Sequence, residues 1–396
     1  MRPAPRLRAF PFVLAVLVSI AFVLSAPFIG YVRSWIRTRF PGEFVRIVGG
    51  AIAILGVAFI AAALARIRSH RALRYGAIAL SIAGAVWFSL ADATGLPDVD
   101  VVQRFHFIEY GVVTFLFYRA WRPLEDPAIV VLPFIAGLIV GTADEWLQWF
   151  IPNRVGEMAD IFLNGVAIAC GLAFSLGALP PSSFSWQWHP RSLRRVGRLG
   201  SAFVLAFAAF FHTVHLGYDI RDEEVGTFKS RYTRASLEAL AASKAEEWRV
   251  HPFPLVLQRV SREDQYMTEG VTHAQKRNEL LTANDAAGAW NENRILEKYY
   301  TPVLDTPSYI SRTGHRWSAE QRADVLARRP PAQAEFSSAA NPYPIYAWPR
   351  LPFWLVSIAA AGVIWMLCAR PFSSVHGSPA FHSRHHPASR RPDGPC

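Results

Sequence analysis

Cysteine is scarce in this chain of 396 residues, and acidic side chains are outnumbered by basic ones. Its three cysteines are too few for a disulfide framework, and the polar segment 217–350 contains none of them. We therefore expect that segment to fold without disulfide bridges. The 30 acids stand against 41 Lys and Arg, which gives a formal net charge of +11.

The chain also lacks the short motifs of the commonest soluble enzymes. It has no glycine-rich nucleotide-binding loop, no CxxC pair and no G-x-S-x-G turn. No basic face interleaved with aromatic residues is present either, so we expect no binding to nucleic acid. The arginines sit instead in short connections between apolar runs, where positive charge sets the orientation of a membrane protein.

Long apolar runs are abundant. A stretch of about 17–25 apolar residues is enough to cross a bilayer as a helix. Hydrophobic residues make up 52% of the chain, yet the mean hydropathy is only +0.18, so a sizeable polar segment must accompany the spans. We predict an all-α membrane protein with about eight transmembrane helices, at residues 10–31, 45–65, 75–92, 105–121, 127–149, 158–178, 199–216 and 351–369.

Basic residues gather at alternate ends of these spans, which indicates the orientation. They precede the first span, join the second to the third and precede the seventh, and these ends belong in the cytoplasm. Arg33, Arg37 and Arg39 after the first span are the exception. The basic start of that span would also suit a signal peptide, but its length and Pro27 favour an uncleaved helix. We expect both termini in the cytoplasm and residues 217–350 outside the cell membrane.

Polar residues recur at the predicted outer ends of the fourth, fifth and sixth spans. His106 and Tyr110 are four residues apart and share a helical face, as do Asp160 and Asn164. The fifth span ends in a stripe that contains Glu145. The candidate functional cluster consists of His106, Glu109, Tyr110, Asp144, Glu145, Gln148, Arg154, Asp160 and Asn164.

The helix dipole affects the acids of this cluster differently. Asp160 lies at the amino end of its span, where negative charge is favoured, so capping alone can explain it. Asp144 and Glu145 lie at a carboxyl end, where the dipole opposes negative charge and compensation is needed. Arg154, Arg104 and a protonated His106 are the candidates for that compensation.

On these motifs the chain resembles the VanZ-like family. The family pattern is an H-F-x-x-Y helix, a G-x-x-D-E-x-x-Q helix end and a D-x-x-x-N-G helix, in that order. A lysine that often precedes the family histidine is replaced by Gln103 and Arg104. The resemblance covers roughly residues 74–179 and carries a link to glycopeptide (teicoplanin) tolerance, which it does not explain. The matching residues are His106, Phe107, Tyr110, Gly141, Asp144, Glu145, Gln148, Arg154, Asp160, Asn164 and Gly165.

Two functions remain open at this point, and transport is a weaker third, because the acids cluster at one face rather than crossing the midplane. The first is a non-enzymatic envelope protein that binds a lipid or cell-wall precursor headgroup at the cluster. The second is a membrane enzyme acting on a lipid-linked envelope substrate with His106 or Glu145 as general base. Only this enzyme alternative calls for a divalent cation, for which Asp144 and Asp160 are the candidate ligands. The sequence leaves cofactors, substrate and oligomeric state undetermined, while membrane lipids are expected partners.

Other prominent residues have simpler interpretations. Trp146, Trp149, Trp348 and Trp354 are expected to form an interfacial belt. Glu269 and His273 have the spacing of metal ligands on a helix, but no second histidine completes the motif. We therefore expect them on a surface helix with ordinary ion pairs.

The expected domain organisation follows from these patterns. Residues 217–350 contain 18 Lys and Arg against 18 Asp and Glu and have helical spacing, and a Pro-rich extended tether leads from them to the last span. The expected divisions are two transmembrane helices in 1–73, a VanZ-like four-helix membrane domain in 74–179, a transmembrane helix at 199–216, a mostly helical extracytoplasmic domain in 217–350, a transmembrane helix at 351–369 and a disordered cytoplasmic tail in 370–396.

Overall fold

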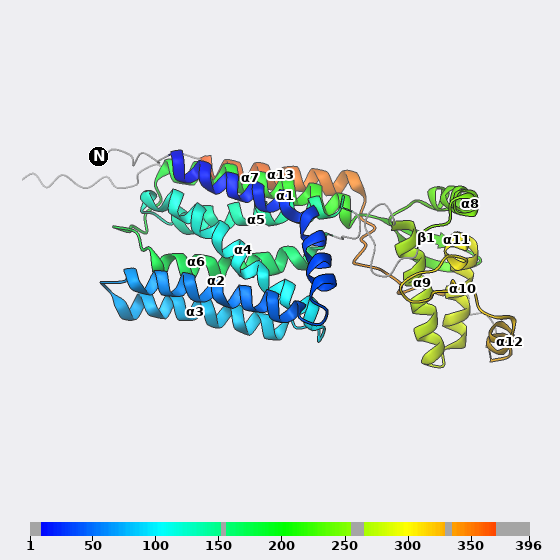
Figure 1. Cartoon of the computed structure of the whole chain (residues 1–396). Coiled ribbons are helices and arrows are strands. Elements are labelled where there is room, and N and C mark those ends of the chain that lie inside the picture. Colours follow the sequence, from blue (N-terminus) through cyan, green and yellow to red (C-terminus); the bar gives the residue numbers. More distant parts are fainter. Residues whose placement is uncertain (1–8, 152–155, 255–264, 329–334, 370–396) are drawn as a thin grey trace, which may run out of the picture.

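Long helices run side by side in one bundle, and a smaller, mostly helical unit lies beyond one end of it (Figure 1). The computed structural model describes residues 9–151, 156–254, 265–328 and 335–369. The tail at 370–396 and Arg154 therefore lie outside the described residues. The bundle helices are α1 (Ala9–Arg39), α2 (Phe44–Arg66), α3 (Arg71–Ala91), α4 (Pro97–Trp121), α5 (Ala128–Gln148), α6 (Met158–Ala178), α7 (Pro190–Val214) and α13 (Arg350–Ala369).

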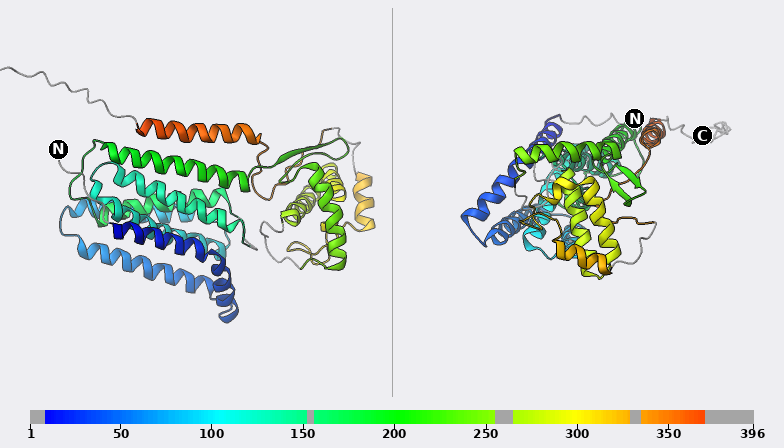
Figure 2. Two further views of the ribbon diagram at one scale, coloured as in Figure 1. Left: turned by 90° about the horizontal axis from the view of Figure 1, so that it is seen from above. Right: turned by 90° about the vertical axis from the view of Figure 1, so that its right-hand side faces the viewer.

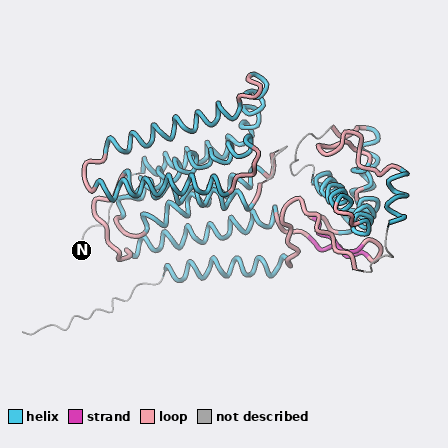
Figure 3. Tube along the Cα trace, turned by 90° about the horizontal axis from the view of Figure 1, so that it is seen from below, coloured by secondary structure: helices cyan, strands magenta, loops and turns pink. Residues whose placement is uncertain are grey.

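The smaller unit, residues 217–349, is called the head domain here, and the bundle end nearest to it is the head end (Figure 2). Among the described residues, strands occur in the head domain, as Figure 3 shows. Its elements are β1 (Tyr218–Asp222), β2 (Gly226–Ser230), α8 (Arg234–Val250), α9 (Gln265–Thr282), α10 (Ala286–Tyr299), α11 (Thr301–Leu304) and α12 (Ala319–Arg328).

Seven helices of the described residues are long and apolar enough to cross a membrane, which makes the chain a multi-pass helical membrane protein. The predicted count of eight is not confirmed. The helix that is not among the seven is α4, which carries Asp98, Asp100, Arg104 and Glu109. It nevertheless packs in the same bundle, against α1, α2, α5 and α6.

Burial separates the centre of the bundle from its perimeter. The most apolar windows of α5 and α6 are 56% and 50% buried, whereas that of α2 is only 6% buried. Large apolar side chains such as Ile54, Leu80 and Leu355 face outward on the perimeter helices. A water-soluble protein rarely exposes such continuous apolar surface, but lipid tails solvate it. The polar residues of interest therefore belong to the best-buried helices.

The first helix is longer than the predicted span 10–31. It continues to Arg39 although Pro27 lies inside it, and it bends in its second half (Figure 1). A proline inside a helix removes one backbone hydrogen bond and kinks the helix without always ending it. The bent end carries Arg37, which forms an ion pair with Asp98 at the start of α4.

The head domain is built on a hairpin and a helical core. The strands β1 and β2 pair antiparallel, from Tyr218 opposite Ser230 to Asp222 opposite Gly226. Gly226 has φ of +92°, a left-handed conformation that glycine adopts without strain. The buried core of the domain includes Ile220, Phe228, Leu237, Val271, Leu296 and Val303.

The described part of the predicted Pro-rich tether, residues 335–349, is non-helical, as expected, but it is packed rather than free. Its Tyr346 pairs with Leu216 as an isolated parallel bridge beside the end of α7. The Tyr346 N–H donates to the carbonyl of His215 at 2.8 Å, and the Gly217 N–H donates to the carbonyl of Tyr346 at 3.0 Å. The chain thus leaves and re-enters the bundle at neighbouring points.

The two helices that flank the head domain, α7 and α13, also lie against each other. The Ser201 hydroxyl donates to the carbonyl of Ala361 at 2.7 Å. Nearer the head end, the indole N–H of Trp354 donates to His212 Nδ1 at 3.1 Å. Polar contacts between membrane helices of this kind fix their register.

Candidate functional site

Two adjacent acids end α5 at the head end of the bundle, and both are buried. Asp144 is 7% exposed and Glu145 is fully buried. The side-chain amide of Gln148 donates to Asp144 Oδ2 at 3.1 Å and to Glu145 Oε1 at 3.0 Å. From α4, the Tyr110 hydroxyl donates to Asp144 Oδ2 at 3.3 Å. These four residues, Tyr110, Asp144, Glu145 and Gln148, are called the acid cluster below.

Among the described residues, three parts of the chain supply hydrogen-bond donors to the acid cluster. Its acids lie in the last turn of α5, where free backbone carbonyls make negative charge unfavourable. Gln148 supplies donors from the same helix and Tyr110 from α4. The third donor is the backbone N–H of Glu157, just before α6, which reaches Glu145 Oε2 at 3.2 Å. Each donor stabilises the charged form of a carboxylate at a helix end where negative charge is unfavourable.

Glycine at position 156 permits this return of the chain over the end of α5. A Cβ atom there would lie 1.9 Å from the backbone oxygen of Glu145, which no side chain can tolerate. The contact places the start of α6 directly on the acid cluster. No local signal in the sequence marks Gly156, because its contact joins the ends of two neighbouring helices.

His106 and Tyr110 share a face of α4, as their spacing predicts. Their rings are parallel to within 2°, with centroids 6.1 Å apart. His106 is half-buried, and its Nδ1 lies 3.1 Å from the carbonyl oxygen of Gln103. Glu109 lies on the same helix and is buried. The histidine therefore borders the acid cluster through Tyr110.

Asn164 of α6 lies one helical layer deeper. It is fully buried, and neither atom of its side-chain amide has a hydrogen-bond partner among the described residues. Facing it is Gly141 of α5, where a Cβ atom would come within 3.1 Å of Asn164 Nδ2 and 3.4 Å of a Tyr110 ring carbon. Gly141 therefore allows α4, α5 and α6 to meet at this level. An unpaired amide inside a membrane bundle is costly, so a ligand or water is expected to complete it.

The nine residues of the predicted cluster are thus distributed unevenly. Tyr110, Asp144, Glu145 and Gln148 are joined by hydrogen bonds, and Asn164 lies beneath them. His106 stacks on the edge of this group. Asp160 is half-buried in the first turn of α6, where the helix dipole favours it. Arg154 cannot be placed, because it lies outside the described residues.

The assignment of Trp149 to an interfacial belt is wrong. Its side chain is 1% exposed and packs edge-on against Tyr343 of the head domain, with ring centroids 5.7 Å apart. The guanidinium of Arg231 lies over the same indole, 5.1 Å from its centroid. Trp348, by contrast, is 49% exposed at the head end. The belt prediction failed for Trp149 because the head domain covers it.

Arg231 joins the head domain to the bundle and was not anticipated. Its guanidinium donates to the carbonyl of Val214, which caps the last turn of α7. Its backbone N–H donates to Glu269 Oε1 at 2.9 Å inside the head domain. No motif marks this residue in the sequence, because its partners are distant along the chain.

Glu269 and His273 are not on a surface helix, contrary to expectation, for each is 1% exposed on the inner face of α9. Glu269 accepts hydrogen bonds from Ser230 at 2.6 Å and Tyr300 at 2.7 Å. Burial raises the pKa of Glu269 above its usual value, although these hydrogen bonds oppose the shift. His273 Nδ1 lies 2.7 Å from Glu292 Oε2. Both residues serve the buried polar core of the head domain.

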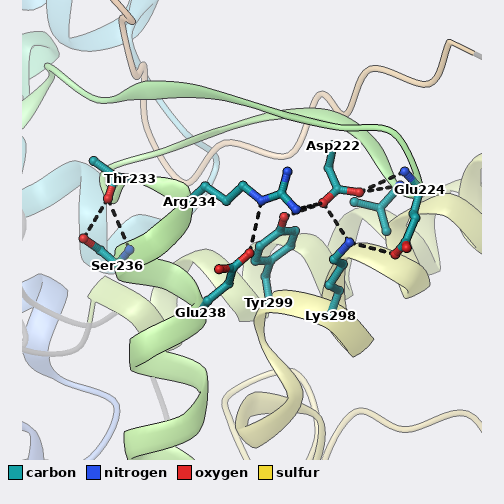
Figure 4. A network of polar contacts seen from close by, with 9 residues as sticks. Asp222, Glu224, Thr233, Arg234, Ser236, Glu238, Lys298 and Tyr299 are labelled. Atoms are coloured by element: carbon teal, nitrogen blue, oxygen red, sulfur yellow. Dashed lines mark hydrogen bonds and ion pairs between the residues drawn. The ribbon is translucent and has the colours of Figure 1, made fainter.

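A second polar network ties the hairpin to the helices (Figure 4). Asp222 receives the Tyr299 hydroxyl at 2.6 Å, and it pairs with Lys298 at 2.8 Å and Arg234 at 3.2 Å. Burial works to raise the pKa of Asp222, but hydrogen bonds from Lys298, from Tyr299 and from the backbone of Glu224 and Val225 outweigh it and hold the pKa well below its usual value. The network fixes β1 against α8 and α10 and has a structural role.

The described residues contain no group of three His, Cys, Asp or Glu side chains that could hold a metal ion. The acid cluster contains carboxylate oxygens and one hydroxyl at the head end of the bundle, and hydrogen-bond donors fix their positions. Such a site can accept hydrogen bonds from hydroxyl, amide or ammonium groups of a ligand.

The family model VanZ/LLP1 matches residues 12–179. This confirms the resemblance drawn from the three motifs and extends it towards the N-terminus, so that the match takes in α1 and α2 as well. No curated protein matches the chain. No solved structure matches it either.

Proposed function

We propose, from the premise that residues 12–179 carry a VanZ-like membrane domain, that the chain binds the polar headgroup of a membrane lipid or of a lipid-linked envelope precursor. The binding site is the acid cluster, with Asn164 beneath it. The observation that carries the proposal is the burial of Asp144 and Glu145 side by side at the carboxyl end of a membrane helix.

Buried carboxylates within a membrane bundle are expensive, and here the helix dipole adds to the cost. A pair of apolar residues would pack the same helix end without it. Carboxylate oxygens accept hydrogen bonds from ligand groups that donate them. Headgroups rich in hydroxyl, amide or amine functions have that chemistry.

The position of the acid cluster suits a lipid ligand. It lies at the end of the bundle, where the lipid headgroups of a bilayer would surround it, and not at the midplane of the helices. The opposite end of the bundle carries the arginines of the α2–α3 connection and of the start of α7. Under the positive-inside rule that end is cytoplasmic, so the acid cluster and the head domain face outward in this proposal.

The enzyme alternative has no observation that favours it over binding. It requires a general base beside a substrate, and His106 or Glu145 would have to serve. The hydrogen bonds given to Glu145 by Gln148 and by the Glu157 backbone stabilise its ionised form. These hydrogen bonds are compatible with Glu145 as a fixed hydrogen-bond acceptor and also as a general base. Only an assay for turnover distinguishes the two roles. In the same proposal, a role in glycopeptide tolerance would follow from binding of the headgroup of the envelope precursor.

Native mass spectrometry of the detergent-released protein tests the proposal. We expect a co-purified lipid on the unaltered chain, and its loss in Asp144→Asn and in Glu145→Gln, since each change removes one charge with little change of shape. The matched control is Asp92→Asn, which alters an exposed carboxylate at the same end of the bundle. Equal lipid occupancy in all four proteins, at equal thermal stability, would rule out the acid cluster as the binding site.

A further inference from the structure

The second half of α1 lies across the end of the bundle and not along it. After the bend it runs crosswise at the head end, so it is seen lengthwise in the right-hand view of Figure 2, which looks along the bundle. Pro27 lies inside the helix, and a proline at such a position kinks it. Residues 27–39 are called the crossing segment below.

The length of α1 exceeds the thickness of a bilayer. Its 31 residues would extend about 46 Å as a straight helix, whereas the hydrocarbon core is about 30 Å thick. The bend keeps the crossing segment at the level of the bundle end, where lipid headgroups lie. This segment therefore meets the surface of the membrane instead of spanning it.

One face of the crossing segment is packed against the bundle. The guanidinium groups of Arg33 and Arg37 lie 5.8 Å and 4.9 Å from the ring centroid of Phe44, the first residue of α2. Arg37 also pairs with Asp98 in the first turn of α4. These contacts fix the segment at the level of the ends of α2 and α4. Two of the three arginines that depart from the positive-inside pattern are thus engaged by the protein itself.

A second face, called the apolar face, is exposed. Phe28, Tyr31, Val32 and Trp35 follow one another at intervals of three, one and three residues and so lie on one side of the helix. Their exposed fractions are 65%, 76%, 55% and 63%. Large apolar side chains that are exposed together, and not singly, mark an interaction surface.

The apolar face continues the lipid-facing surface of the first half of α1. Leu17, Ile20 and Leu24 are exposed there, and Phe28 follows Leu24 at the next turn of the same stripe. Lipid tails surround that stripe inside the bilayer. Because the stripe runs on into the apolar face, lipid is the partner that fits this face as well.

The rest of the crossing segment has the composition of a helix that lies in the membrane interface. Gly30 and Ser34 are exposed on a third side, called the polar face. Arg39 follows Trp35 by four residues, is exposed, and forms no ion pair within the part of the chain that the structure describes. Interfacial helices combine an apolar face, a polar face and basic residues, and Tyr and Trp are enriched at that depth.

We propose that the crossing segment is an interfacial helix that binds the phospholipid layer at the head end of the bundle. The apolar face enters the boundary between headgroups and acyl chains, the polar face meets water, and Arg39 attracts anionic headgroups. The proposal is independent of headgroup binding at the acid cluster, because the two surfaces share no residue. It also holds whichever side of the membrane the head end faces.

Fluorescence quenching on the full chain in vesicles of phosphatidylcholine and phosphatidylglycerol tests the apolar face. The chain carries Cys170→Ala, Cys368→Ala and Cys396→Ser, and the small dye bimane is attached through Trp35→Cys. The matched control is the neighbouring Ser34→Cys. We expect doxyl groups on the acyl chains to quench the dye several-fold more strongly at position 35 than at position 34. Iodide in the water should quench in the reverse order, because adjacent residues lie on different faces.

Spin-labelled phosphatidylglycerol and phosphatidylcholine, compared at the same doxyl position, test Arg39. We expect the anionic lipid to quench the dye at position 35 more strongly, by up to about fivefold, the effect of one basic residue near an anionic membrane surface. Arg39→Gln should abolish this preference. Arg66→Gln is the control, since Arg66 is an exposed arginine at the opposite end of α2.

Three outcomes would overturn the proposal. Equal quenching profiles at positions 34 and 35 would show that the crossing segment has no lipid-facing side. Protection of the dye at position 35 from lipid and iodide alike, repeated with Tyr31→Cys, would show that protein covers the apolar face, for example a second copy of the chain. A preference for the anionic lipid that is absent from the start, or that persists in Arg39→Gln, would exclude Arg39 from the contact.

Discussion

The guanidinium of Arg231 lies over the indole of Trp149, with 5.1 Å between its central carbon and the ring centroid. Trp149 follows directly after the helix that carries the acid cluster, and its backbone N–H donates to the carbonyl of Glu145 at 3.2 Å. Through its own backbone, Arg231 is bonded to the buried Glu269. One residue thus connects the core of the head domain with the end of α5.

We predict that Arg231→Ala destabilises the protein by roughly 2 kcal/mol, because it removes a cation–π contact and the cap on α7. Thermal unfolding and limited proteolysis of the connection between α7 and β1 measure the effect. Arg249→Ala is the control, since Arg249 is exposed and pairs with Glu246 on its own helix. Equal melting temperatures for the two variants would show that Arg231 does not hold the head domain.

Gly156→Ala is expected to be strongly destabilising. The added Cβ would lie 1.9 Å from the Glu145 oxygen, so the start of α6 must move and the hydrogen bond from Glu157 to Glu145 is lost. Gly50→Ala in α2 is the matched control, with nothing within 4 Å of its added Cβ. Because alanine favours helices over glycine by about 1 kcal/mol, the control should melt at the same or a higher temperature. A Gly156→Ala protein as stable as the control would contradict the described geometry.

Asn164→Leu should not lower the stability of the bundle, although Asn164 is fully buried. Its amide has no partner among the described residues, and an unpaired buried amide costs about 1–3 kcal/mol. Asn293→Leu is the comparison, because Asn293 is paired to Arg277 at 2.8 Å and Glu297 at 2.9 Å. We expect that variant to melt at a lower temperature. A large loss of stability in Asn164→Leu would mean that the amide is already satisfied in the empty protein.

The stability of the head domain should fall in mild acid because of His315. Burial, aided by the charge of Arg277, lowers the pKa of His315 from 6.5 to about 4. The unfolded chain takes up a proton below pH 6.5, whereas the folded group resists it. The contribution of neutral His315 to the free energy of unfolding is therefore complete above pH 6.5. It is lost as the pH falls from 6.5 towards about 4, by up to roughly 3 kcal/mol.

His315→Gln is expected to remove this part of the acid sensitivity, and His251→Gln, which changes an exposed histidine, is the control. The raised pKa of Glu269 acts in the opposite sense, since a folded state that holds this carboxyl protonated gains stability as the pH falls. Melting temperatures measured at several pH values for the two variants isolate the histidine. If both variants lose stability equally in acid, His315 is not the group responsible.

The bundle could be predicted closely from the sequence, because lipid-facing helices are marked by continuous apolar runs. The predicted spans at 45–65 and 158–178 agree with Phe44–Arg66 and Met158–Ala178 within one residue at each end. The first helix was predicted too short, because its apolar run ends near residue 31, whereas the helix continues to Arg39. Helix α4 carries several charges, and the predicted span at 105–121 is not among the seven helices apolar enough to cross a membrane.

Tertiary contacts account for what the sequence could not reveal. The helical spacing of His106 and Tyr110 predicted a shared face correctly, because both lie on one element. Trp149 and Arg231 come from separate elements, and no local pattern pairs them. Glu269 was assigned to a surface because charged residues usually lie there, yet β2 and α11 close over it. Burial of a polar group is decided by its neighbours in space.

The bridge between Leu216 and Tyr346 has a topological consequence. The whole head domain is an insertion into a hairpin of two membrane helices, α7 and α13, whose ends are already in contact. Chain can be added or removed at such a point without altering the order of helices in the membrane. A version of the protein in which Gly217 is joined to Tyr346 by a short turn would retain every bundle helix in its place, and it would separate what the membrane part does from what the insertion adds.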